Sequence, residues 1–294
     1  MAEADLETLW GGPAGFPPRL WTLLCALHRL PWPLGEDILG AVFAAKAFIK
    51  LGELRRALAW ASGFATGARR YRLALSLLAL RGRFVARGAL VGARSVDDVL
   101  RQFDVRGLDH LRAVSGAVIL LGFHVGPPYS YLALRATGRP VSVLALRCLP
   151  EKWSRDIWRR PESDNQDLVV GRDEFSRATM LHRAQQVLQG GGALYMTADT
   201  VPEGAGREAF RLTVHGREVV VRSGWLTLLR RTGAAVLPVL AHLDGRRAIV
   251  TIHPPLPEPG PDGILDLTAY REALERLLVD YAGRFPDQCW SLAL

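Results

Sequence analysis

The chain has 294 residues, 49% of them hydrophobic and 22% charged, which is ordinary for a globular protein that buries a full core. Its cysteines, Cys25, Cys148 and Cys289, are odd in number and lack metal-type spacing, which argues against a disulfide framework and favours a reducing compartment. The acidic start, residues 1–7, is unlike a signal peptide, and no uninterrupted apolar run reaches the roughly 18 residues of a spanning helix.

The net charge of +8 is concentrated in one region, because eleven basic residues and a single acid, Glu53, lie between Lys46 and Arg94. This region is helical by pattern, and its arginines alternate with Leu, Ala, Trp and Phe. A basic helix with an apolar face is typical of membrane-surface binding, so we expect an anionic membrane surface as partner and no nucleic acid. A merely solvated arginine-rich surface is the alternative.

The first hundred residues predict helices, and the rest of the chain predicts alternating strands and helices. Leu/Ala/Arg periodicity indicates helices at 19–30, 35–51, 53–63 and 69–87, and a helix cap at 95–98. Short apolar runs then predict strands at 117–123, 141–147, 167–170, 193–198, 235–241 and 247–252. Helical patterns fall between them at 128–137, 151–159, 174–189, 222–232 and 266–283.

This alternation predicts an α/β fold with a mostly parallel sheet flanked by helices and an N-terminal helical cap. We divide the chain into a helical, membrane-surface-associated region, 1–100, packed on an α/β domain, 101–294.

His124 is the first candidate for chemistry. It follows the apolar run 117–121 and opens a Gly/Pro turn, at the sheet edge where ligands of α/β proteins bind. With an ordinary pKa of about 6.5, a histidine there can act as a general base at neutral pH.

Four blocks of the sequence resemble the lipid A late acyltransferases, the lauroyl/myristoyl transferases of the lysophospholipid acyltransferase superfamily. They span about residues 100–290 in the correct order. The blocks are residues 103–111 with 116–124, the strand 193–199 ending in Asp199, residues 222–225 with 232–238, and the C-terminal Pro-X-Gln-X-Trp of 286–290.

The resemblance implies a glycerolipid acyltransferase-like fold and transfer of a fatty acyl chain from an acyl carrier protein or coenzyme A thioester to a hydroxyl of a glycolipid or related amphiphile. His124 would take the proton of the acceptor hydroxyl, with no covalent acyl-enzyme. No cofactor beyond the thioester co-substrate is implied. The expected location is peripheral, on the cytoplasmic face of the bacterial inner membrane.

The chain departs from the family pattern at the acid that follows the catalytic histidine, because Tyr129 stands at the position of that acid. A phenol carries no charge to stabilise an imidazolium at neutral pH. Asp199 is the expected structural support and Glu218 the expected replacement acid. The alternatives are a weak or inactive homologue that binds acyl carriers or lipids, or an acyltransferase of a specialised metabolite pathway.

Several further residues are candidates for substrate binding. Because Pro127 and Pro128 lack an N–H, the amides of Gly126, Tyr129 and Ser130 must stabilise any oxyanion at this turn. Three arginines that follow strand ends could bind the phosphates of an acyl carrier or a lipid headgroup through their guanidinium groups: Arg147, Arg160 and Arg172. Gly224 is a further candidate because it belongs to the third block that resembles the family. No histidine or cysteine spacing predicts a metal site.

Overall fold

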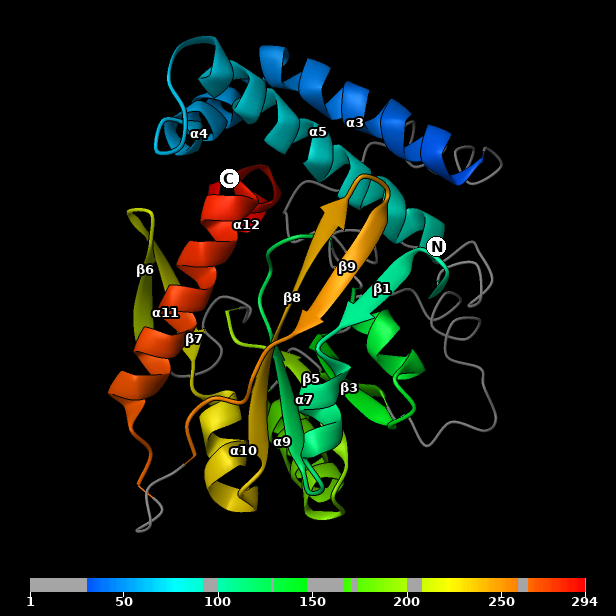
Figure 1. The fold of residues 1–294 in the computed structure, drawn as a ribbon, viewed down its shortest axis with the longest axis vertical. Coiled ribbons are helices and arrows are strands. Elements are labelled where there is room, and N and C mark those ends of the chain that lie inside the picture. The colour runs from blue at the N-terminus through cyan, green and yellow to red at the C-terminus, as the bar shows by residue number, and fades with distance from the viewer. Residues whose placement is uncertain are drawn as a thin grey trace.

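The computed structural model describes residues 31–91, 100–127, 130–146, 167–170, 174–199, 208–258 and 264–293. Its helices α3, α4 and α5 lie together at one end of the molecule, above a curled sheet with helices on its faces (Figure 1). No helix in these ranges combines the length and the apolar character needed to cross a membrane.

The N-terminal helices are α3 (Trp32–Ile49), α4 (Leu51–Ala61) and α5 (Gly67–Val91). α3 packs closely along α5 because Gly82 has no side chain: a Cβ there would overlap the carbonyl oxygen of Leu39. The same contact buries an ion pair, in which Arg87 Nε donates to Glu36 at 2.8 Å and Arg87 Nη2 donates to the carbonyl of Arg246 at 2.8 Å. α3, α5 and the β8–β9 turn are therefore joined by one buried guanidinium.

The described residues form a seven-stranded sheet in the order β1-β9-β8-β2-β5-β3-β4, in which only the β8–β9 pairing is antiparallel. The strands are β1 (Phe103–Arg106), β2 (Val118–Gly122), β3 (Val141–Leu146), β4 (Asp167–Val170), β5 (Ala193–Thr197), β8 (Ala235–Asp244) and β9 (Arg247–Ile252). Strand β2 is central and buried on both faces, as expected for a continuous apolar run in a parallel sheet.

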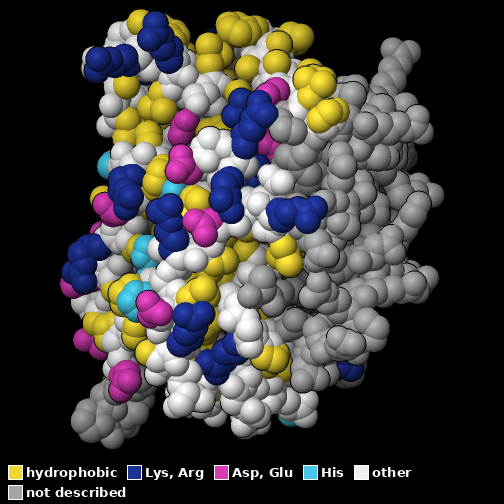
Figure 2. All heavy atoms as spheres, turned by 45° about the vertical axis from the view of Figure 1, so that its right-hand side comes forward, with side chains coloured by type: hydrophobic (Ala, Val, Ile, Leu, Met, Phe, Trp, Pro, Cys, Tyr) yellow, Lys and Arg dark blue, Asp and Glu magenta, His cyan; other side chains and the backbone are white. Residues whose placement is uncertain are grey.

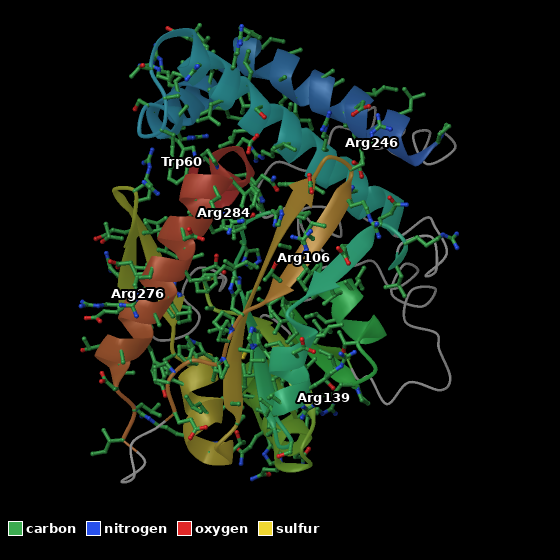
Figure 3. The ribbon with its side chains drawn as sticks, in the orientation of Figure 1. Trp60, Arg106, Arg139, Arg246, Arg276 and Arg284 are labelled. Carbon is green, nitrogen blue, oxygen red and sulfur yellow. The ribbon has the colours of Figure 1, made fainter. Side chains whose placement is uncertain are left out.

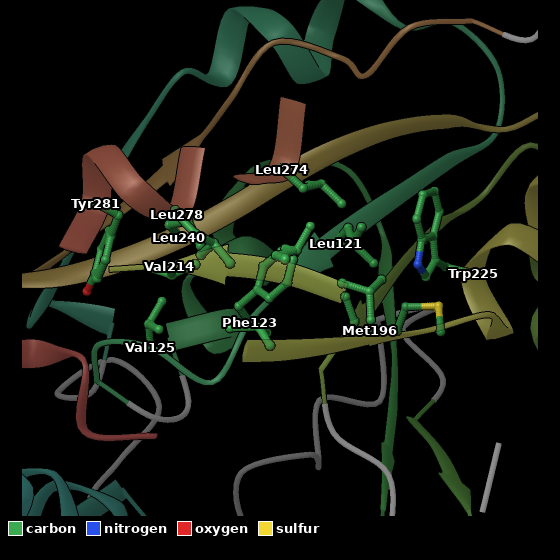
Figure 4. Close-up of a cluster of buried hydrophobic side chains, with 14 of the residues drawn as sticks. Leu121, Phe123, Val125, Met196, Val214, Trp225, Leu240, Leu274, Leu278 and Tyr281 are labelled. Atoms are coloured by element: carbon green, nitrogen blue, oxygen red, sulfur yellow. The ribbon is translucent and has the colours of Figure 1, made fainter. Parts of the chain in front are cut away.

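Two apolar clusters cover the faces of the sheet. Ile119 and Leu121 face one cluster, whereas Val118 and Leu120 face the other, as the alternation of a strand requires. The first cluster lies under α9 (Glu174–Gln189), α10 (Gly224–Thr232), α11 (Leu267–Arg284) and the separate hairpin of β6 (Glu208–Val214) and β7 (Arg217–Arg222). Figure 4 shows part of it, with Leu274 and Leu278 of α11 lying near Leu121 and Phe123.

Short elements complete the fold. The helix α7 (Leu108–Ala113) and the 3₁₀ helix η1 (Ser130–Ala136) pack on the second cluster. At the C-terminus, η2 (Pro286–Gln288) and α12 (Trp290–Ala293) reach the N-terminal helices: Trp60 Nε1 donates to the carbonyl of Pro286 at 2.7 Å, and Ser76 Oγ donates to Asp287 at 2.6 Å. Trp60 lies beside this end of the chain in Figure 3.

The predicted α/β class with a mostly parallel sheet is confirmed, and the predicted strands agree with the observed ones to within about three residues. Three strands, β1, β6 and β7, were missed. The predicted helix 128–137 is instead the 3₁₀ helix η1. The predicted helices at 19–30 and 151–159 and the cap at 95–98 lie outside the described residues, and the division at residue 100 stays a prediction.

The buried Arg87–Glu36 pair gives a first testable prediction. Glu36→Ala leaves a buried guanidinium without its carboxylate, so we expect a loss of about 3–5 kcal/mol in the free energy of unfolding. The control is Glu272→Ala, which removes an exposed pair with Arg276 on α11 and costs at most about 0.5 kcal/mol. Equal urea midpoints for the two variants would contradict the assignment.

Candidate active site

The pairing of β2 with β5 brings His124 and Asp199 together. These parallel strands are in register, with Gly122 opposite Thr197, and the Ala198 N–H donates to the Gly122 carbonyl at 2.9 Å. His124 and Asp199 each lie two residues beyond this last pair. Both side chains therefore emerge at the carboxyl edge of the sheet, where open α/β sheets bind ligands.

Asp199 holds His124 at two points. One carboxylate oxygen lies 2.8 Å from the Nδ1 of the imidazole, and the other accepts the backbone N–H of His124 at 2.9 Å. Because a carboxylate only accepts hydrogen bonds, the neutral ring carries its proton on Nδ1 and its lone pair on Nε2. The aspartate side chain is 10% exposed and the histidine side chain 38% exposed, so the pair is held in the protein while the ring reaches solvent.

The charge of Asp199 determines how His124 titrates. Burial alone would lower the pKa of His124, but the attraction of the aspartate charge and the hydrogen bond to it outweigh burial, so the pKa lies above its ordinary value of 6.5. The arrangement stabilises an imidazolium that forms when the ring accepts a proton. It is thus suited to a general base oriented by a carboxylate.

A partly buried tyrosine of β5, Tyr195, lies near this carboxylate. Burial, together with the charge of Asp199, raises the pKa of Tyr195 well above its ordinary value of 10. Its ring also stacks on Tyr131 of η1, with 5.4 Å between ring centroids. Tyr195 is therefore a neutral phenol at any physiological pH, and the sequence alone gave no signal for its part in the site.

The turn after His124 is shaped by Gly126, whose φ of +71° lies in the left-handed region. A Cβ at this position would overlap the carbonyl oxygen of Ala241 and lie 2.7 Å from the Tyr281 hydroxyl. The Gly126 N–H donates to the carbonyl of Gln288 at 2.9 Å, so the expected oxyanion role of this amide is not supported. Ser130 is buried, and its hydroxyl donates to the Pro127 carbonyl at 2.6 Å.

The two acids singled out in the sequence have different positions. Glu218 lies at the exposed start of β7, where its carboxylate accepts a hydrogen bond from Arg211 at 2.7 Å and is 64% exposed. Asp199, expected as structural support, instead makes the direct contact with the imidazole. The acid in contact with His124 is therefore Asp199, whereas Glu218 pairs with Arg211; the catalytic role of either acid stays a prediction.

The remaining predicted binding residues are only partly described. Gly224 begins α10, and a Cβ on it would lie 3.7 Å from the Met196 side chain of β5. The N–H of Arg222, two residues earlier, donates to the carbonyl of Ala198 at 2.8 Å, which brings the start of α10 close to Asp199. Four candidates lie outside the described residues: Tyr129, Arg147, Arg160 and Arg172.

Comparison with known proteins gives no family: no family model matches the chain, and no curated protein sequence matches it. Within the described ranges, no group of three or more His, Cys, Asp or Glu side chains is placed to hold a metal ion.

The His124–Asp199 contact predicts a measurable change in titration. In Asp199→Asn the charge that raises the histidine pKa is gone and burial remains, so we expect the pKa of His124 to fall below 6.5 from a wild-type value above it. The pKa is read from an NMR titration of isotope-labelled histidine, with His124→Gln identifying the resonance. The same His124 titration in both proteins would rule out the contact.

Proposed function

We propose that this protein transfers a fatty acyl chain from an acyl thioester to a hydroxyl of a glycolipid or a related amphiphile, with His124 as general base and Asp199 as its carboxylate partner. The observation that carries the proposal is the 2.8 Å contact between the imidazole Nδ1 and Asp199 at the carboxyl edge of β2 and β5. The choice of acyl transfer over other base-catalysed reactions rests on the four sequence blocks that resemble the lipid A late acyltransferases.

The proposed reaction is an addition and elimination at the thioester carbonyl, without a covalent acyl-enzyme. The acceptor hydroxyl forms the new C–O bond as Nε2 of His124 takes its proton, and the carbonyl oxygen becomes an oxyanion in the tetrahedral intermediate. The C–S bond then breaks, and the imidazolium returns the proton to the departing thiolate. The products are an ester and a free thiol, and Asp199 stabilises the imidazolium between the two steps.

The Asp199 contact bears on the alternative of an inactive homologue. That alternative was motivated by Tyr129, which stands where the resembling family has an acid. A carboxylate that comes from the neighbouring strand can do the same electrostatic work, because orientation and charge stabilisation depend on its distance from Nδ1 rather than on its position in the sequence. The contact therefore favours an active enzyme.

The proposed donor is an acyl carrier protein or acyl-coenzyme A, and the proposed location is peripheral, on the cytoplasmic face of a bacterial inner membrane. The outer surface of α3 supports the membrane partner. Large apolar side chains lie exposed along it and at its junction with α4, with Phe48 62% and Ile49 85% exposed; the others are Leu34, Val42 and Leu51. Apolar side chains on the outward face of a helix are stabilised when they are buried, and the interface of a lipid bilayer can bury them.

Positive charge next to this apolar surface favours a membrane that contains anionic lipids. Lys50 lies exposed at the α3–α4 junction, and Arg55 and Arg56 follow it on α4. Burial, followed by the positive charges of Lys50 and Arg81, lowers the pKa of Lys46, while the charge of Glu53 raises it. In Figure 2, hydrophobic side chains gather at the top of the molecule, the end formed by these helices in Figure 1, together with Lys and Arg.

The catalytic assignment is tested by transfer assays with labelled acyl carrier protein or acyl-coenzyme A and a bacterial lipid extract. We expect His124→Ala and Asp199→Asn to lower the rate by about 10²–10⁴-fold, the range of general-base contributions. Wild-type activity should rise with pH through a pKa above 6.5, because the base form accumulates as the proton leaves.

Glu218→Gln is the matched carboxylate control and should retain wild-type activity, since Glu218 pairs with Arg211. Transfer that survives His124→Ala would contradict the base assignment. The absence of transfer by the wild type with either donor would favour the lipid- or carrier-binding alternative.

The membrane partner is tested by vesicle sedimentation. We expect wild-type binding to vesicles containing phosphatidylglycerol, weakened by high salt through screening of the basic residues. Ile49→Glu should weaken binding about tenfold or more, because it removes an apolar side chain worth about 1.5–3 kcal/mol when fully buried. Val279→Glu, at a partly exposed position of α11, is the control and should bind as the wild type. A wild-type protein that does not sediment with anionic vesicles at low salt would contradict the proposed membrane partner.

A further inference from the structure

The backbone of the turn that carries His124 is held by side chains and backbone groups from outside the turn. The N–H of His124 donates to Asp199, and its carbonyl accepts a hydrogen bond from Ser291 Oγ. The N–H of Gly126 donates to the Gln288 carbonyl at 2.9 Å, and its carbonyl accepts from Trp290 Nε1 at 3.2 Å. Three of these four bonds come from the C-terminal segment 286–291.

The C-terminal segment is itself fixed from three sides. The side-chain amide of Gln288 makes a two-point contact with β8, accepting from the Leu243 N–H at 2.6 Å and donating to the Leu243 carbonyl at 2.9 Å. Pro286 and Asp287 are tied to Trp60 of α4 and Ser76 of α5. The residues that hold the turn are therefore themselves held by hydrogen bonds to α4, α5 and β8.

These hydrogen bonds matter because the turn of His124 has little regular secondary structure of its own. His124 and Gly126 lie beyond the last residue of β2 and before η1 begins at Ser130. A strand or helix would supply their hydrogen bonds from regular backbone pairing, whereas here three of the four bonds come from residues more than 160 positions away. Misplacement of a catalytic group by about 1 Å can cost on the order of 100-fold in rate.

We propose that Ser291 and Trp290 are positioning residues for His124. By bonding the carbonyls of His124 and Gly126, they fix the backbone direction of the turn, so that the imidazole meets Asp199 with its Nε2 directed away from the carboxylate. Asp199 accepts the backbone N–H of His124, and Ser291 donates to the backbone carbonyl of the same residue. The inference concerns the geometry of His124, and only its kinetic readout rests on the proposed acyl transfer.

The decisive variants remove one hydrogen bond each and keep the packing. Ser291→Ala removes the hydroxyl that bonds the His124 carbonyl, and Trp290→Phe removes the indole N–H while keeping an aromatic ring. Ser291→Thr restores a hydroxyl and should restore the wild-type behaviour. The matched control is Ser62→Ala, which removes a hydroxyl that bonds the Ala59 carbonyl at 2.7 Å on the exposed end of α4.

The first readout is the NMR titration of His124, which needs no substrate. We expect Ser291→Ala and Trp290→Phe to lower the pKa of His124 from its raised value toward 6.5 or below, because the contact with Asp199 loosens, while thermal unfolding shows that the protein remains folded. Ser291→Thr and Ser62→Ala should titrate as the wild type. Folded Ser291→Ala and Trp290→Phe proteins with an unchanged His124 titration would overturn the inference.

The second readout is the division of any rate loss between kcat and KM. A positioning role predicts a kcat lower by about 10- to 100-fold in Ser291→Ala with KM little changed, because the acceptor still binds but meets a misdirected base. A rise in KM alone would overturn the positioning role. If wild-type protein shows no transfer, the proposed function fails, and the NMR titration still decides the positioning of His124.

Discussion

The in-register pairing of β2 with β5 is the constraint on which the candidate site depends. A one-residue slip between these parallel strands would turn every side chain of one strand to the opposite face and separate the imidazole from Asp199. The slip is prevented by burial, since the five residues of β2 are buried and the first four alternate between two apolar clusters. The register that packs the core is thus the register that builds the His–Asp pair.

The second constraint is that the C-terminal segment 286–291 bridges the helices α4 and α5 and the turn of His124. The C-terminal segment 286–291 lies between the N-terminal helices and the turn of His124, and it bonds to both. The helices α4 and α5, against which α3 packs, are therefore linked to the candidate base through a short run of hydrogen bonds.

Local patterns in the sequence predicted the elements but not their partners. The apolar runs of β2, β5 and β9 and the turn residue His124 could be recognised because each signal lies within a few residues. The strands β6 and β7 were missed although the end of β6 alternates, with Leu212 and Val214 buried and Arg211 and Thr213 exposed. Asp199 was recognised as important but not as the partner of His124, since that depends on which strands pair across 75 positions.

The source of the carboxylate changes what controls the pair. An acid at position 129 would be positioned by the local turn, and changes in the sheet would affect it little. Asp199 is positioned by a strand, so its 2.8 Å distance to Nδ1 depends on the packing around β5, including Leu194 and Met196 in the cluster beneath. A core with close packing transmits small volume changes, so substitutions there should alter the titration of His124 before they unfold the protein. The negative charge beside His124 is therefore supplied by Asp199 at the end of a strand, so residue 129 does not have to supply it.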